Sequence, residues 1–392
     1  MPARNLLSPD VQETLLKRNF QELSLTQQKA IPPICEGNHL LLIAPTGTGK
    51  TESAMLPVFD QLLRLHGGGF KAVYITPLRS LNRDILFRLQ WWCHELGLTV
   101  GVRHGDTSQY ERRKQALNPP DLLITTPETL QALFIGKRLR EHLPHVRYVI
   151  IDEIHELAGS KRGAQLSIAL ERLVEYAGEF QRIGLSATVG NPEEVAAFLT
   201  GNKRPHTIVN IPAAPHMDIS VRFAGEDFDS QVRAVERCID HEKSSLLFVN
   251  TRSTAEALGH RLYERGDVEV HHGSLSKEIR IDAEDRFKRG ELRSLICTSS
   301  MELGIDIGHI ERVIQFGSPR EVSRLLQRVG RAGHRLDTVS HGTILATGFD
   351  DLCESLVITR KAKQNESEDV CIIHGALDVL ANQIAALLVE YG

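Results

Sequence analysis

Four short segments in the first half of the chain recur, in the same order, in the second half. The pairs are "YITPLRSL" (74–81) with "FVNTRSTA" (248–255), "RHGDTS" (103–108) with "HHGSLS" (271–276), "LLITTPETL" (122–130) with "LICTSSMEL" (295–303), and "VRYVIIDE" (146–153) with "IERVIQFG" (310–317). The offset between partners stays between 164 and 174 residues, which chance would not maintain over four pairs. The repeat predicts two domains that share one architecture.

The fold class follows from the pattern around these segments. Apolar runs such as "KAVYITP" and "DLLITTP" end in polar turns, and amphipathic stretches such as "SLNRDILFRLQWW" separate them. This alternation predicts α/β domains in which helices cover a parallel sheet. A chain of 392 residues with 41% apolar content can bury two such cores.

The expected boundaries follow from composition. We expect the first domain at 1–205, a linker at 206–217 within the proline-containing "NKRPHTIVNIPAAPHMD", and the second domain at 218–360. The polar stretch "RKAKQNESED" then leads into "GALDVLANQIAALLVEYG", which has the spacing of one amphipathic helix. With no further segment to cover that helix, we expect 361–392 to open a domain of a longer protein.

Composition excludes some classes of protein. The net charge of −4 provides no overall attraction to nucleic acid or to an anionic membrane, so any such binding depends on local basic side chains. The six cysteines are scattered without the spacing of a zinc or redox motif, and neither a signal peptide nor a membrane-spanning run is present. We therefore expect a cytoplasmic protein with reduced cysteines and no membrane partner.

A phosphate-binding loop occupies residues 44–52, "APTGTGKTE", directly after the apolar run "HLLLI". Backbone N–H groups of such a loop surround the phosphates of ATP, and the helix that follows directs its N-terminus at them. The expected ATP ligands here are Thr46, Gly47, Thr48, Gly49, Lys50 and Thr51. Lys50 is expected at the β- and γ-phosphates and Thr51 on Mg²⁺. The usual first glycine of the motif is replaced by Ala44.

An acidic pair follows the apolar strand in "VIIDEIHEL". Asp152 is the expected second Mg²⁺ ligand, and Glu153 the residue that orients or deprotonates the attacking water. His155 could connect this pair to the "SAT" turn that begins at Ser186, or could cap a helix. The second copy has Phe316 and Gly317 at the corresponding positions, so only the first domain is expected to bind the nucleotide.

A basic segment of the second copy, "LLQRVGRAGHR" (325–335), could complete the ATP site. Gln327, Arg328 and Arg331 are the candidates, because an arginine from a second domain can neutralise charge on the transferred phosphoryl group. A solvated basic helix is the alternative. Gly330 and Gly333 disfavour that alternative, since glycine weakens a helix and indicates a close approach.

Polar turns at matching positions of the two copies suggest a track for nucleic acid. The candidates are Pro77, Arg79, Gly105, Thr107, Thr126 and Pro127 in the first copy and Thr251, Arg252, Gly273, Ser274 and Thr298 in the second. Hydroxyls and N–H groups suit phosphate oxygens and read no base sequence. Ordinary helix N-caps are the alternative for each turn. Trp91 and Trp92 could stack on bases, but their helical spacing favours core packing.

Taken together, these motifs resemble the motif series of superfamily 2 helicases, and most closely the Lhr (large helicase-related) family of archaea and bacteria. The resemblance rests on "TQQKAIP", "APTGTGKTE", "TPLRSLNRD", "TTPETL", "DEIH", "LSAT", "FVNTRS", "HHGSLS", "CTSSMELGIDIG" and "QRVGRAGHR". It implies two RecA-like domains with ATP between them, and movement from 3′ to 5′ along single-stranded DNA. It also implies unwinding of DNA or RNA–DNA duplexes with tails.

The resemblance also implies roles for single residues. Gln27 would read adenine, Gly304 and Asp306 would contact the nucleotide, and Arg331 would be the arginine finger. Residues 361–392 would contain the first helix of a winged-helix domain. The tetrad "DEIH" departs from "DEAD", which argues against a DEAD-box RNA remodeller, and His334 stands where DEAD-box proteins have a further arginine.

Three activities are compatible with these motifs. The first is a monomeric helicase, and the second is a nucleic-acid-stimulated ATPase that translocates without separating strands. The third is a DEAD-box-like RNA remodeller or a nucleotide-gated clamp, and Glu153 and Arg331 together disfavour the clamp. The sequence provides no recognisable element for splitting strands, and phosphate contacts leave DNA and RNA undistinguished.

Overall fold

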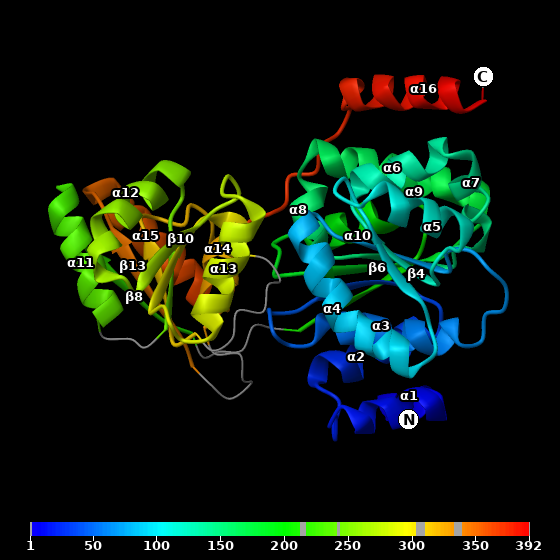
Figure 1. Cartoon of the computed structure of the whole chain (residues 1–392), viewed down its shortest axis with the longest axis horizontal. Coiled ribbons are helices and arrows are strands. Elements are labelled where there is room, and N and C mark those ends of the chain that lie inside the picture. The colour runs from blue at the N-terminus through cyan, green and yellow to red at the C-terminus, as the bar shows by residue number, and fades with distance from the viewer. Residues whose placement is uncertain (1, 212–216, 241–243, 303–309, 333–338, 392) are drawn as a thin grey trace. The chain divides into compact units, whose positions relative to one another are not determined.

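The computed structural model describes residues 2–211, 217–240, 244–302, 310–332 and 339–391. By contact clustering the chain forms two compact units. The first comprises Met1–Ala44, Thr48–Ile211 and Asp369–Gly392, and the second comprises Pro45–Gly47 and Pro212–Glu368. Each unit is an α/β domain with a central parallel sheet, which confirms the predicted fold class (Figure 1).

The first unit contains a seven-stranded sheet of order β3-β4-β2-β5-β6-β1-β7 in which every paired strand is parallel. Its strands are β1 His39–Ile43, β2 Ala72–Ile75, β3 Val100–Arg103, β4 Leu122–Thr125, β5 Tyr148–Ile151, β6 Gln181–Ser186 and β7 His206–Asn210. Its helices are η1 Ala3–Leu6, α1 Pro9–Lys17, α2 Leu25–Cys35, α3 Lys50–Leu62, α4 Arg79–Glu95, α5 Gln109–Leu117, α6 Pro127–Ile135, α7 Lys137–Arg140, η2 Leu143–His145, α8 Ile154–Ala158, α9 Lys161–Ala177, α10 Pro192–Thr200 and α16 Leu377–Tyr391.

Alternate residues of these strands pack into two separate apolar cores, as the period of a strand requires. Leu40, Leu42 and Tyr74 face the core formed with α1, α2, α3 and α4. Leu41 and Ile75 face the core formed with α6, α8, α9 and α10. The two groups of helices cover opposite faces of the sheet (Figure 1). Both faces are buried, which explains why the strands are almost wholly apolar.

The second unit repeats this plan with a six-stranded parallel sheet of order β10-β11-β9-β12-β13-β8. Its strands are β8 Met217–Phe223, β9 Ser245–Phe248, β10 Val268–His271, β11 Ser294–Cys297, β12 Arg312–Phe316 and β13 Ser340–Ala346. Its helices are α11 Phe228–Asp240, α12 Arg252–Leu262, η3 Tyr263–Arg265, α13 Lys277–Lys288, η4 Ser299–Met301, α14 Val322–Val329 and α15 Phe349–Lys363. One face packs on α13, α14 and α15, and the other on α11 and α12.

The internal repeat corresponds to equivalent strands of the two sheets. The four sequence pairs fall on β2 and β9, on the ends of β3 and β10, on β4 and β11, and on β5 and β12. These strands occupy the same places in the two sheet orders. The repeat predicted from the sequence is therefore a structural repeat. The strand registers place Phe248 at the position of Ile75, one residue out of step with the sequence pairing of Tyr74 and Phe248.

The segment between the two units differs from the linker expected at 206–217. Residues 206–210 form strand β7, which pairs with β1 at the edge of the first sheet, and Met217 already begins β8. The division falls after Ile211. An edge strand such as β7 is only half-buried, so its sequence lacks the long apolar run that identifies the central strands.

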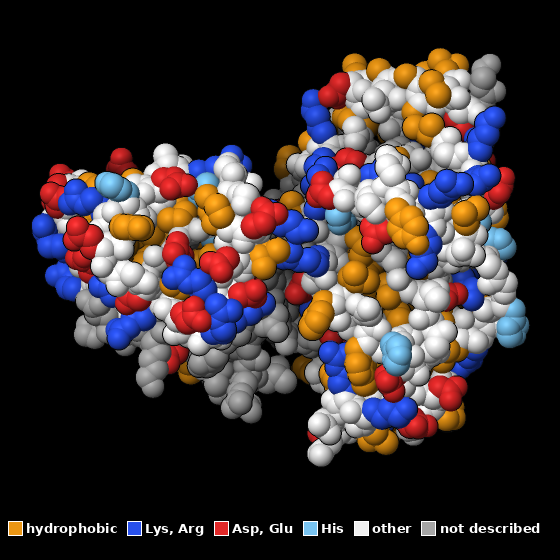
Figure 2. Space-filling model, viewed as in Figure 1, with side chains coloured by type: hydrophobic (Ala, Val, Ile, Leu, Met, Phe, Trp, Pro, Cys, Tyr) orange, Lys and Arg blue, Asp and Glu red, His pale blue; other side chains and the backbone are white. Residues whose placement is uncertain are grey.

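The amphipathic pattern near the end of the chain is a helix, α16, and it lies against α9 and α6 of the first unit. Val379 and Gln383 are buried in this contact. The more apolar side of the helix faces outward, where hydrophobic side chains cover its surface (Figure 2). The exposed apolar residues of α16 are Leu377, Leu380, Ile384, Leu388 and Val389. That the helix opens a winged-helix domain stays a prediction.

No helix in the part of the chain that the structure describes has the length and apolar character needed to cross a membrane.

Candidate active site

The candidate ATP site lies at one edge of the first sheet. Because all paired strands are parallel, their carboxyl ends meet there, which is where open α/β sheets bind ligands. Strand β1 leads into the phosphate loop, β5 leads into the acidic pair, and β6 lies between them and ends at Ser186. The topology therefore brings together motifs that are about 100 residues apart in the sequence.

The phosphate loop has the backbone conformation that its glycines allow. Gly47 and Gly49 have φ of 78° and 83°, a region that other residues rarely adopt. Gly49 is the N-cap of α3, so the N–H groups of the first turn of α3 can donate hydrogen bonds to a phosphate. The Lys50 ammonium donates a hydrogen bond to the Ala44 carbonyl at 2.9 Å. The lysine thus lies against the loop that it is expected to serve.

The acidic pair is held in one orientation at the end of β5. The backbone N–H of Glu153 donates to Asp152 Oδ1 at 3.0 Å, and the Tyr74 hydroxyl donates to Asp152 Oδ2 at 2.8 Å. Glu153 has φ of 45°, which is unfavourable for a residue with a side chain. Strained backbone of this kind concentrates at functional sites. Glu153 is the N-cap of α8, so the chain leaves the direction of strand β5 at this residue.

The chemistry of this pair suits a divalent cation. Burial and the neighbouring Glu153 raise the pKa of Asp152 to about 6, while Tyr74 and Lys50 act in the opposite direction. A bound cation would favour the ionised carboxylate. Carboxylate and hydroxyl oxygens are ligands that Mg²⁺ prefers, and it takes few protein ligands when phosphates supply the rest. Asp152 and Thr51 therefore fit the expected metal, and no cluster of three or more His, Cys, Asp or Glu side chains competes for one among the described residues.

His155 connects the acidic pair to β6. Its Nδ1 lies 3.1 Å from the Ser186 hydroxyl, and burial lowers the pKa of the imidazole to about 4. The ring is therefore neutral at physiological pH and can hold this hydrogen bond there. Of the two roles considered for His155, the structure supports the link to the "SAT" turn.

Gln27 lies beside the phosphate loop as part of a capping box. Its backbone N–H donates to the Ser24 hydroxyl, and its side-chain oxygen accepts the Ser24 N–H at 2.9 Å. The Ser24 hydroxyl donates to the Thr48 carbonyl at 3.2 Å, so α2 is attached to the loop. The expected contact of Gln27 with adenine stays a prediction.

The turns expected to bind nucleic acid in the first unit follow β2, β3 and β4, the other half of the same sheet. Arg79 pairs with Asp106, and a side chain at Gly105 would come within 2.7 Å of the Arg79 guanidinium. The hydroxyl of Thr107 accepts the His104 N–H, and that of Thr126 bonds to Thr129. Both threonines thus hold their own turns. Trp92 is buried in the core, which confirms the packing expected for it.

A residue that the sequence motifs did not identify ties two of these turns together. Arg162, in the first turn of α9, donates to the Pro77 carbonyl at 2.7 Å and binds both carboxylate oxygens of Glu128 at 2.6 and 3.2 Å. Pro127 and Glu128 begin α6. The arginine therefore fixes the turn after β2 to the turn after β4. The "SKRG" segment contained this residue but carried no chemical signal.

The equivalent turns of the second unit follow β9, β10 and β11. Thr251 is the N-cap of α12 and its hydroxyl accepts the Thr254 N–H, so the N-cap alternative holds for this residue. Arg252 is exposed, and no atom lies within 4 Å of a side chain built at Gly273. His272 accepts the Ser274 N–H and contacts Glu256. Thr298 precedes η4.

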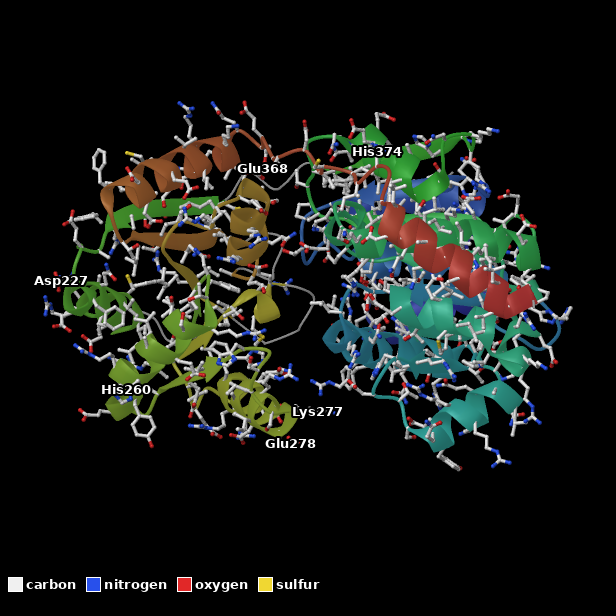
Figure 3. The ribbon with its side chains drawn as sticks, turned by 90° about the horizontal axis from the view of Figure 1, so that it is seen from above. Asp227, His260, Lys277, Glu278, Glu368 and His374 are labelled. Atoms are coloured by element: carbon white, nitrogen blue, oxygen red, sulfur yellow. The ribbon has the colours of Figure 1, made fainter. Side chains whose placement is uncertain are left out.

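Helix α14 carries the basic segment of the second unit. The Arg328 guanidinium is buried over the Phe248 ring and bonds to Glu302, Gln315 and Asn250. These partners satisfy it within its own domain, so its expected contact with ATP stays a prediction. Just after this helix, Arg331 donates a hydrogen bond to the Glu302 carbonyl at 2.7 Å. At its start, the carboxylate of Glu368, which Figure 3 labels, accepts the Val322 and Ser323 N–H groups.

Some expected residues cannot be placed. Gly304 and Asp306 lie outside the described residues, as do Gly333 and His334. Gln327 is buried on α14, close to Arg328 in sequence. Its catalytic role, like that of Arg331, stays a prediction.

Comparison with known proteins adds two family matches. The family described as "DEAD/DEAH box helicase" matches residues 24–195, and the family described as "Helicase conserved C-terminal domain" matches residues 230–335. These ranges contain the phosphate loop and acidic pair in the first unit and α14 in the second.

Individual relatives are more specific. The chain is 38% identical to the ATP-dependent helicase Lhr-Core of Methanothermobacter thermautotrophicus over 98% of its length, which is 49% of that protein. It is 37% identical to the Lhr helicase/uracil glycosylase of Escherichia coli over 97% of its length and 30% of that protein. The solved structure of Mycobacterium smegmatis helicase Lhr bound to ssDNA and AMP-PNP has a TM-score of 0.89 and 37% identity, and covers 99% of this chain and 54% of that one.

The chain thus spans about half the length, or less, of these relatives. The matches include both parallel-sheet units and the α16 segment, since they cover nearly the whole chain. The chain belongs to the Lhr family of superfamily 2 helicases.

Proposed function

We propose that this chain is an ATP-dependent helicase that moves from 3′ to 5′ along single-stranded DNA and unwinds DNA or RNA–DNA duplexes. The observation that carries the proposal is the edge of the first sheet. There the phosphate loop, the acidic pair and the His155–Ser186 link lie beside the turns after β2, β3 and β4. An ATP site and a phosphate-binding surface on one rigid sheet are what a nucleic-acid-driven ATPase needs.

Within this proposal each residue has a defined task. Bound Mg²⁺ would neutralise charge on the phosphates, and Asp152 and Thr51 would hold it. Lys50 binds the phosphates, and Glu153 orients the attacking water and accepts its proton. Arg331 of the second unit supplies positive charge to the transferred phosphoryl group. The solved Lhr structure was bound to ssDNA and an ATP analogue, which supports DNA as the substrate.

The test is ATP hydrolysis and strand separation on duplexes that differ in one feature at a time. A 3′-tailed DNA duplex should stimulate hydrolysis and be unwound, a 5′-tailed duplex should stimulate hydrolysis without being unwound, and a blunt duplex should do neither. An RNA tail tests the choice of sugar. Glu153→Gln should retain ATP binding and lose turnover. Hydrolysis at the same rate with and without nucleic acid would overturn the proposal.

The second candidate is a nucleic-acid-stimulated ATPase that translocates without separating strands. No strand-splitting wedge is identified among the described residues, which keeps this candidate beside the helicase, while Glu153 and Arg331 disfavour a clamp. Stimulated hydrolysis together with displacement of a bound protein, but no unwinding of a 3′-tailed duplex, would identify it.

A further inference from the structure

A tyrosine hydroxyl lies in the core of the first unit, where an apolar residue would suffice. Tyr74, on β2, is fully buried and faces the core formed with α1, α2, α3 and α4. A buried hydroxyl is costly unless it is hydrogen-bonded, and tyrosine is chosen over phenylalanine where its oxygen has a partner. The partner here is the carboxylate of Asp152, 2.8 Å away.

The hydrogen bond from Tyr74 holds the carboxylate oxygen of Asp152 that does not accept the Glu153 N–H. Strands β2 and β5 are paired so that Ile75 is opposite Ile151, and the Asp152 N–H donates to the Ile75 carbonyl at 2.8 Å. Strand β2 therefore sets the backbone of Asp152 as well as its side chain. One carboxylate oxygen accepts the Glu153 N–H and the other accepts the Tyr74 hydroxyl. Each oxygen keeps a lone pair for another ligand.

The same phenol lies near the second expected Mg²⁺ ligand, Thr51, on the first turn of α3. Its hydrogen bond is to the Asp152 carboxylate. A group that orients metal ligands in this way affects metal affinity without touching the metal.

The second copy of the domain provides an internal comparison. The second copy has Phe316 at the position of Asp152. The registers of the paired strands place Leu247 of β9 at the position of Tyr74, because Ile314 lies opposite Leu247 and Ile150 lies opposite Tyr74. The tyrosine hydroxyl and its carboxylate partner therefore occur together in the copy that has the acidic pair. An apolar residue fills this position in the copy that lacks it.

We propose that Tyr74 is a positioning residue that holds the Asp152 carboxylate in the orientation that binds Mg²⁺ with ATP. The inference rests on the proposed function, because it assigns Tyr74 to the metal site of the same ATPase. It gives the β2 strand a direct part in the nucleotide site.

The test is the Tyr74→Phe variant, which removes one oxygen and keeps the ring. Binding of a fluorescent ADP analogue is measured as Mg²⁺ is increased from zero, in the full chain. The half-saturating Mg²⁺ concentration should rise about 10- to 100-fold, the usual effect of losing an orienting partner of a metal ligand. Binding in EDTA should be unchanged, and kcat should fall more than KM for ATP rises.

A matched control removes a hydroxyl from the neighbouring strand. Tyr148 is the first residue of β5, at the end of the strand opposite the acidic pair. Tyr148→Phe should leave the Mg²⁺ dependence unchanged. The same control excludes a general effect of losing a tyrosine hydroxyl near this sheet.

A double-mutant cycle keeps the inference falsifiable if Tyr74→Phe is less stable than the parent. In an Asp152→Ala background, Tyr74→Phe should cause no further change in Mg²⁺ dependence, because the acceptor of the tyrosine hydroxyl has already been removed. Equal Mg²⁺ dependence of the parent and Tyr74→Phe would overturn the inference, as would full additivity in the cycle. Absence of Mg²⁺-dependent nucleotide binding in the parent would instead overturn the proposed function.

Discussion

A buried ion-pair cluster attaches α16 to the first unit, in which Glu390 pairs with Arg172 and with Arg140. Arg172 on α9 bonds to the Glu390 carboxylate, to Gln383 at 3.0 Å and to Gln131 at 3.1 Å, and its guanidinium lies over the Phe134 ring. The Glu390 side chain is fully buried. The contact is thus polar, and the apolar side of α16 contributes little to it (Figure 2).

The expected effect of Glu390→Gln follows from this geometry. Removing one partner of a buried ion pair costs about 3–5 kcal/mol, but the amide oxygen can still accept a hydrogen bond, so about 2 kcal/mol is expected. That is about a 30-fold change in the equilibrium between attached and detached helix. A helix of 15 residues is marginal on its own in water, so detachment should unfold it.

Hydrogen exchange of the amides in 377–391 measures this equilibrium directly. Glu390→Gln should speed their exchange about 30-fold while leaving α3 and the strands of the first sheet protected. The matched control is Asp378→Asn on the same helix, where the pair with Lys161 is mostly exposed. Such pairs contribute little, so less than about a threefold change is expected there. Equal exchange in Glu390→Gln and the parent would refute the reasoning, as would equal effects of the two variants.

Three further predictions concern the ATP site. Glu153→Gln should lower the turnover of ATP at least about 10²-fold with little change in ATP binding by titration, since the carboxylate acts on water; weaker binding with unchanged turnover would contradict this. Arg331→Ala should lower kcat at least about 10²-fold with KM nearly unchanged in steady-state kinetics, because the contact forms mainly in the transition state; a rise in KM alone would make it only a binding residue. The Mg²⁺ needed for half-maximal ATPase should rise as pH falls through about 6, because protons and metal compete for Asp152; a flat dependence between pH 5 and 8 would show that its pKa is not raised.

The last of these predictions has a counterpart in stability. Because the pKa of Asp152 is raised in the folded state, the folded chain holds a proton that the unfolded chain releases between pH 3.8 and about 6. Without metal, this carboxyl therefore favours folding at the acidic end of that window, and its contribution is lost as pH rises through about 6. Mg²⁺ with nucleotide should restore stability above pH 6, which thermal unfolding can measure.

The sequence predicted most of the fold because the strands end in chemically distinctive turns. "APTGTGKTE" and "VIIDE" each combine an apolar run with residues that few structural roles require, and the repeat placed both copies in register. The edge strand β7 was missed because its residues are only half-buried, so they resemble a linker. Helix α16 was expected from its spacing, but not that its polar side would face α9, because Arg172 lies about 200 residues earlier and forms no motif.

The residues that the sequence did not reveal share one property. Tyr74, Arg162 and Glu302 act on motif residues from neighbouring strands or helices, so their roles depend on strand register and helix position. In the sequence alone, Tyr74 is one more apolar residue of β2. Only the pairing of β2 with β5 shows that its oxygen lies on Asp152.

The two copies together indicate how one architecture came to hold two tasks. At the end of β5 the first unit has a carboxylate supported by a tyrosine, and at the end of β12 the second unit has Phe316. Beside that position, the second unit uses Phe248, Gln315 and Glu302 to hold Arg328. Arg328 is paired with Glu302 within its own unit, so the second copy has a closed ion pair near the sheet edge where the first copy has the acidic pair. The carboxylates of the first copy therefore suit a cation, whereas the charges of the second copy hold its own helix α14 in place.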